Sequence, residues 1–99
     1  MLFRSTLTGG LNTPAIAPDH ASIAFNTTQV ANQPFTLADG LEFQTKTLCA
    51  QTKGTGNVVV TPANLTGGTT ITFGTAGFFI ELKFVGGSWQ KVGGTAVIA

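Results

Sequence analysis

Short β-rich segments separated by glycine-containing turns fill the chain from Pro34 onward, and this rhythm constrains the fold more than any other feature. The turns recur about every 8–12 residues, which is the spacing of strands in a sandwich or barrel. The clearest strand runs from Phe78 to Val85, where apolar and polar side chains alternate. Its expected dry face holds Phe78, Ile80, Leu82 and Phe84, opposite Glu81 and Lys83. The pattern predicts an all-β domain without helices, a small antiparallel β-sandwich or barrel, over residues 34–99.

The other expected strands follow from the same alternation and from the positions of glycine and proline. They cover Phe35 to Leu37, Leu41 to Ala50, Asn57 to Thr61, Thr69 to Phe73, Trp89 to Val92 and Thr95 to Ile98. In the strand expected from Leu41 to Ala50, the buried face should hold Leu41, Phe43, Thr45 and Thr47. The solvent-facing side, expected to be wet, should hold Glu42, Gln44 and Lys46. Ala38-Asp39-Gly40 and Gly86-Gly87 indicate hairpin turns, because glycine accepts positive φ.

Residues 1–33 show no sustained alternation of apolar and polar side chains, and they form a separate N-terminal part of the chain. Breaker signals interrupt them at Gly9-Gly10, Asn12-Thr13-Pro14 and Pro18-Asp19. We expect an extended N-terminal arm with one short strand at Ala21 to Asn26. Its apolar residues are too many for a free tail, so the arm should pack on a neighbouring subunit or on another surface. These residues are Leu2, Phe3, Leu7, Leu11, Ile16, Ile23 and Phe25.

Charged residues make up only 9% of the 99-residue chain, against roughly 25% in soluble domains. A surface this poor in charge resists aggregation weakly when it is bare, which indicates that much of it is covered in an assembly. The net charge is +1 and the basic residues are scattered, so nucleic-acid binding is disfavoured. No apolar run reaches about 18 residues and no basic amphipathic helix is visible, which disfavours a membrane partner.

Residues that carry catalysis or bind metals are few. His20 is the only histidine and Cys49 the only cysteine, too few for a zinc site within one chain. The carboxylates are Asp19, Asp39, Glu42 and Glu81. Their spacing pairs no two of them for acid–base work. We therefore expect no enzyme, no catalytic residue, no cofactor and no metal, and the single cysteine fits a reducing compartment.

Trp89 lies on an expected hairpin and has two interpretations. It could be a platform for a carbohydrate, or it could pack in the core or in a subunit interface. Packing is favoured, because tryptophan buries a large area and is enriched at interfaces.

The segment from Asn57 to Phe73, with its Val-Val-Val-Thr-Pro strand, is followed by Gly77, by Leu82 to Trp89 and by Val92-Gly93. Together with Ala38-Asp39-Gly40 and Lys46, these motifs resemble a C-terminal module of tailed-bacteriophage virion proteins: capsid decoration proteins, head fibres and tail fibres. The resemblance covers roughly residues 36–98. It implies a homotrimeric β-domain that attaches to a phage particle or projects from it, and it brings no catalytic motif.

Two functions remain open. The first is a capsid decoration (cement) protein that binds the outer surface of the assembled head and stabilises it, and the short chain favours this one. The second is a head- or tail-fibre tip module that binds a host glycan or receptor. We expect a homotrimer assembled in the host cytoplasm, with the major capsid protein as partner and with the outer capsid surface of the virion as its location. The candidate interface residues are Leu2, Phe3, Leu7, Leu11, Ile16, Phe25, Phe79, Val85, Trp89 and Val97.

Overall fold

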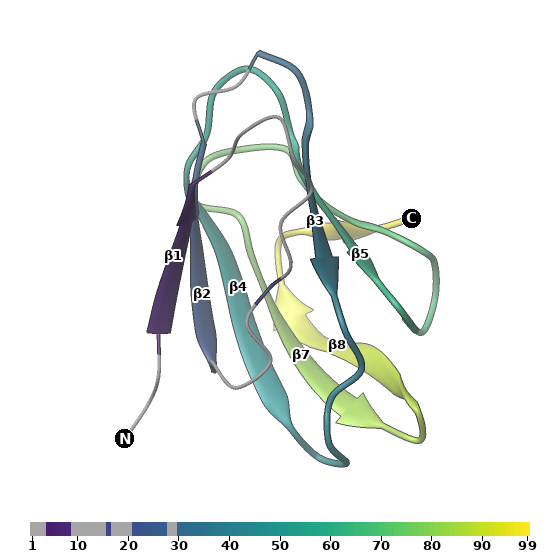
Figure 1. The fold of residues 1–99 in the computed structure, drawn as a ribbon. Coiled ribbons are helices and arrows are strands. Elements are labelled where there is room, and N and C mark those ends of the chain that lie inside the picture. Colours follow the sequence, from purple (N-terminus) through teal and green to yellow (C-terminus); the bar gives the residue numbers. More distant parts are fainter. Residues whose placement is uncertain (1–3, 9–15, 17–20, 28–29) are drawn as a thin grey trace.

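A computed structural model describes residues 16, 21–27 and 30–99, and residues 4–8 by their backbone (Figure 1). This part of the chain is all-β and holds no helix, as the sequence predicts. Its strands are β1 (Arg4–Thr8), β2 (Ser22–Asn26), β3 (Gln33–Leu37), β4 (Thr45–Thr52), β5 (Val58–Pro62), β6 (Ile71–Phe73), β7 (Phe79–Val85), β8 (Ser88–Gly94) and β9 (Val97–Ile98).

The strands form two sheets that pack together as one compact globule. The five-stranded sheet has the order β1-β2-β4-β7-β8, and the four-stranded sheet has the order β3-β5-β6-β9. Both sheets are mixed, because β1, β2 and β4 run parallel, as do β3 and β5, while the other pairs are antiparallel. The expectation of an antiparallel architecture is therefore wrong for the first half of the chain.

Two of the parallel pairs, β2 with β4 and β3 with β5, arise because the chain alternates between the two sheets from β2 to β5. Two successive crossings bring the chain back to the first sheet in its original direction, so β4 pairs with β2 in parallel. For the same reason Ala38-Asp39-Gly40 is not a hairpin turn: it leads from β3 in one sheet to β4 in the other. The Gly86-Gly87 hairpin is confirmed, with φ of 63° and 89° in a type I′ arrangement between β7 and β8.

The core lies between the two sheets and is centred on three phenylalanines. The ring of Phe25 on β2 lies 4.6 Å from Phe35 on β3 and 5.6 Å from Phe73 on β6, between ring centroids. All three rings are fully buried. The predicted alternation on β7 is confirmed, since Ile80, Leu82 and Phe84 are buried and Glu81 is exposed.

Of the expected N-terminal arm, the structure describes residues 4–8, 16, 21–27 and 30–33, and those from Ser22 to Asn26 lie in a sheet of the domain. The expected short strand is present as β2, but it lies inside the five-stranded sheet between β1 and β4. Phe25 is fully buried and Ile16 is 2% exposed, so both belong to this chain's own core and are not surface residues. The reason is that β2 finds its apolar cover on Phe35 and Phe73 of the opposite sheet. Leu2, Phe3 and Leu11 lie outside the described residues.

We predict that Phe25→Ala lowers the free energy of unfolding by about 3–5 kcal/mol, because it leaves a cavity between the sheets. Phe79→Ala is the matched control: Phe79 is half-buried on the opposite face of the same sheet, and its loss should cost clearly less. Urea denaturation measures both. An unchanged midpoint for Phe25→Ala would mean that residues 22–26 behave as a detachable arm.

Candidate functional site

Among the described residues, five large apolar side chains are exposed. They are Val30, Leu41, Phe43, Val92 and Val97. Two of them, Leu41 and Phe43, lie on one short connection between β3 and β4, with exposed fractions of 79% and 66%. Large apolar side chains gathered on one loop are candidates for contact with another molecule.

Residues 41–44 form a closed turn, here called the 41–44 turn. The amide of Gln44 donates to the carbonyl of Leu41 at 2.9 Å, and Oε1 of Gln44 accepts from the amide of Leu41 at 2.9 Å. Phe43, the third residue, has φ of 66° and is the only non-glycine residue with positive φ in the described chain. A β-turn with positive φ only at its third residue is of type II, in which glycine usually holds that position.

The same residues form a β-bulge against β7. The amide of Phe43 donates to the carbonyl of Phe84 at 2.7 Å, and the amide of Phe84 donates to the carbonyl of Gln44 at 2.8 Å. Two residues thus oppose one, with the first in the left-handed region, which is the G1 type of bulge. Glycine is usual there, so a phenylalanine costs backbone strain of roughly 1–2 kcal/mol.

The expected faces of residues 41–50 are wrong, because residues 41–44 form a turn and β4 begins only at Thr45. Leu41 and Phe43 therefore do not belong to a buried strand face, and they are exposed together with Thr45. Lys46, expected on the wet side, is 2% exposed, in step with the buried Leu48 and Ala50.

Trp89 fixes the first residues of the connection between β3 and β4. Its indole Nε1 donates to the carbonyl of Ala38 at 3.0 Å, and its ring packs edge-on against Phe84 with 5.2 Å between centroids. Gly40 lies against the same ring, so close that a Cβ there would come within 2.8 Å of ring carbons. Trp89 is fully buried, which removes it both as a candidate interface residue and as a carbohydrate platform at the surface.

Two carboxylates tie the β3–β4 connection to neighbouring loops. Oε1 of Glu42 accepts from the amide of Gly86 in the β7–β8 hairpin at 3.0 Å. Both carboxylate oxygens of Asp39 accept from Nδ2 of Asn64 at 3.0 Å. The turn is therefore held in one conformation while its apolar side chains point outward.

A lysine lies beside the exposed ring. Nζ of Lys83 is 5.6 Å from the centroid of the Phe43 ring, within the range of a cation–π interaction. The turn thus presents two apolar side chains with a positive charge beside them.

The outer face of the four-stranded sheet is uncharged. The register places Pro34, Val59, Thr72 and Val97 side by side across its four strands. Thr36 and Thr61 form the adjacent pair on the same face. None of these six side chains is charged, and Val97 is 56% exposed.

The remaining candidate interface residues do not gather in one place. Phe79 and Val85 are half-buried on the outer face of the five-stranded sheet, whereas Val97 lies on the other sheet. Leu7 lies on β1 opposite Phe25 in the register. The sequence pattern does not reveal that Leu41 and Phe43 are exposed, because no glycine marks position 43 as a left-handed one.

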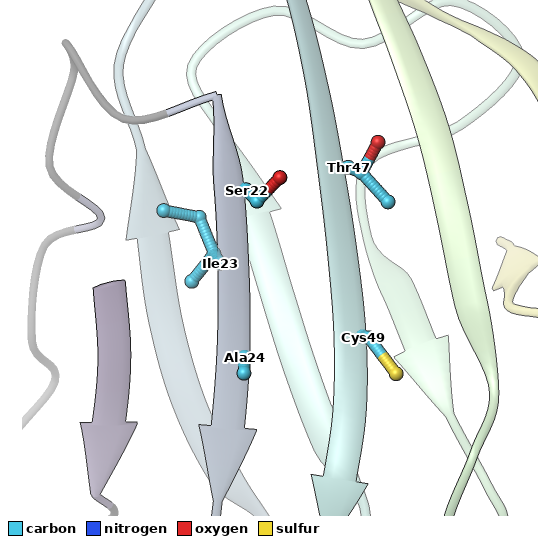
Figure 2. A pocket seen from close by; sticks show the side chains of 5 residues that line it. All are labelled: Ser22, Ile23, Ala24, Thr47 and Cys49. Atoms are coloured by element: carbon cyan, nitrogen blue, oxygen red, sulfur yellow. The ribbon is translucent and has the colours of Figure 1, made fainter. Parts of the chain in front are cut away.

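A shallow hollow of about 250 Å³ opens between β2 and β4, and Figure 2 shows the side chains that line it. They are Ser22, Ile23, Ala24, Thr47 and Cys49. The set contains a half-buried thiol and two hydroxyls but neither a carboxylate nor an imidazole, so it supplies no general base.

Within the described part of the chain, no three His, Cys, Asp or Glu side chains are grouped so that they could hold a metal ion. The same residues contain no helix of the length and apolarity needed to cross a membrane. His20 and Asp19 lie outside the described residues.

No protein-family model matches the chain, and a search of curated proteins gives no significant match. The resemblance to phage virion modules therefore stays a prediction.

We predict that Phe43→Gly leaves the melting temperature unchanged or raises it, because relief of the strain offsets the roughly 0.5–1 kcal/mol entropic cost of glycine. A gain of 1 kcal/mol corresponds to about 4–8 °C in a domain of this size. Phe43→Val should lower the melting temperature, since a β-branched residue fits positive φ worst. Calorimetry checks both, and equal losses in the two variants would contradict a strained position 43.

Proposed function

We propose that this protein is a bacteriophage capsid decoration protein, which binds the outer surface of the assembled head as a homotrimer and reinforces it. One observation carries the proposal: the row Pro34, Val59, Thr72 and Val97 makes a broad sheet face with no charged side chain. Such a face loses little on desolvation, because it carries no ion whose hydration must be removed. It suits contact with a large, equally neutral protein surface.

The chemistry of the rest of the surface supports a structural role. A chain with 9% charged residues presents threonines and glycines where other domains present lysines and glutamates. Contacts between such surfaces are individually modest. Three copies attached together multiply them, because binding of the first copy raises the effective concentration of the other two.

The alternative is a fibre-tip module that binds a host glycan. It depends on an exposed aromatic platform with free polar groups around it. Trp89, the single tryptophan of the chain, is fully buried. Glu42 and Asp39 are tied to neighbouring loops through Gly86 and Asn64. Because the buried Trp89 offers no platform at the surface, the decoration protein is favoured.

The test is to strip the protein from virions that carry it, to add it back, and to measure the resistance of the heads to heat at low and high salt. We expect restored resistance at both salt concentrations, since neutral contacts are screened far less than ionic ones. Rebinding to the tail alone, or full occupancy without a gain in resistance, would favour the fibre module.

A pair of lysine variants locates the contact face. Thr72→Lys places a charge on the uncharged face, and we expect it to weaken rebinding at least about tenfold, because the ammonium must be desolvated. Thr47→Lys is the matched control, since Thr47 is also a half-buried threonine that faces outward, but from the other sheet. Equal loss in the two variants would argue against the four-stranded sheet as the contact face.

A further inference from the structure

The strain in the 41–44 turn does not serve to bury the apolar side chains of the turn. Phe43 occupies a left-handed position and yet is 66% exposed, and Leu41 beside it is 79% exposed. A glycine at position 43 would allow the same turn and bulge at less cost. Strained residues of this kind are concentrated at sites that bind other molecules.

The same chain offers an apolar hollow at the ends of β3 and β5. It has a volume of about 490 Å³, and its lining includes Ile16, Leu37, Ala38, Pro62 and Ala63. No lining residue is charged. The hollow is open to solvent, and its volume is similar to the roughly 300–1,000 Å³ of ligand pockets, so apolar side chains can enter it from outside.

The turn is held away from the hollow of its own chain. Phe43 and Gln44 are bonded to Phe84, and Glu42 is bonded to Gly86, all on the side of β7 and its hairpin. The hollow lies beside β3 and β5 of the opposite sheet. Reaching it would break the bulge and the turn, so Leu41 and Phe43 do not fill the hollow of their own chain.

Charge complementarity points to a second copy of this chain. Lys83 lies beside Phe43 on the turn, and Asp39 directly follows Ala38, which lines the hollow. A turn seated in the hollow of another copy would bring this lysine toward that aspartate. The net charge of +1 opposes such an association very little.

We propose that the 41–44 turn of one copy binds in the Ile16–Leu37–Pro62 hollow of a second copy, with Lys83 facing Asp39. Each copy has one turn and one hollow, so the contact closes either reciprocally in a pair or head to tail in a ring. A ring of three is the homotrimer expected from the sequence. The inference does not depend on attachment to a capsid, because its test uses the purified protein alone.

The experiment measures the mass of the purified full-length protein by sedimentation over micromolar to high-micromolar concentrations. We expect wild type to associate and Phe43→Gly to associate at least about 30-fold more weakly, the effect of losing a central aromatic anchor. Val92→Thr is the matched control, because Val92 is 64% exposed but lies on β8, outside the turn. It should associate like wild type.

A mixing experiment separates the turn from the hollow. Ala63→Trp fills the hollow and should also abolish self-association, while its turn stays intact. Each variant should be monomeric by itself. When Ala63→Trp is mixed with Phe43→Gly, whose hollow is intact, the turn of the first should bind the hollow of the second, and the two should form a heterodimer. Thr36→Trp, at an exposed lining position, serves in the same way if Ala63→Trp does not fold.

The proposal is overturned if wild type stays a monomer throughout, or if Phe43→Gly associates as strongly as wild type. It is also overturned if both folded variants are monomeric and their mixture gives no heterodimer. Melting curves of each variant accompany the measurement, so that loss of association is read only from folded protein.

Discussion

The buried indole of Trp89 is the contact on which the arrangement of the loops at this end of the molecule depends. Its Nε1 bonds the carbonyl of Ala38, its ring lies against Gly40, and its backbone bonds Asn64 and Thr66. One residue of β8 therefore fixes both the β3–β4 and the β5–β6 connections. Without this contact, residues 38–40, which precede the 41–44 turn, would not be held in place. The apolar side chains of the turn would then not point in one fixed direction.

The molecule leaves its sheet faces bare but covers part of its sheet edges. The backbone of Asn64 and Thr66 pairs with Trp89 at the free side of β8, and the amide of Ile16 donates to the carbonyl of Thr36 on the edge strand β3. Open edges invite indiscriminate strand pairing. Covering them while leaving neutral faces directs association to side chains, which can be selective.

The sequence predicted those elements whose pattern is local. The alternation from Phe78 to Val85 and the Gly86-Gly87 hairpin needed only neighbouring residues, and both are present. The parallel pairing of β2 with β4 could not be read, because no local signal says that the chain crosses between sheets. The faces of residues 41–50 were misassigned because Phe43 adopts the positive φ of a turn, a conformation that a glycine in the sequence usually indicates. The candidate site was missed for the same reason, since a strained phenylalanine looks like a core residue in an alternating run.

The crossings between the sheets also govern how the chain reaches its fold. Strand β2 pairs with β4 while β3 pairs with β5, so the two parallel ladders are interleaved along the chain and joined by Phe25 and Phe35. Neither ladder can form as a local hairpin, and each loop must close before its contacts compensate the lost entropy. High contact order of this kind slows folding, and it requires β7 to join β4 before the five-stranded sheet is complete. A nascent chain on the ribosome thus stays unfinished until nearly all of its residues have emerged.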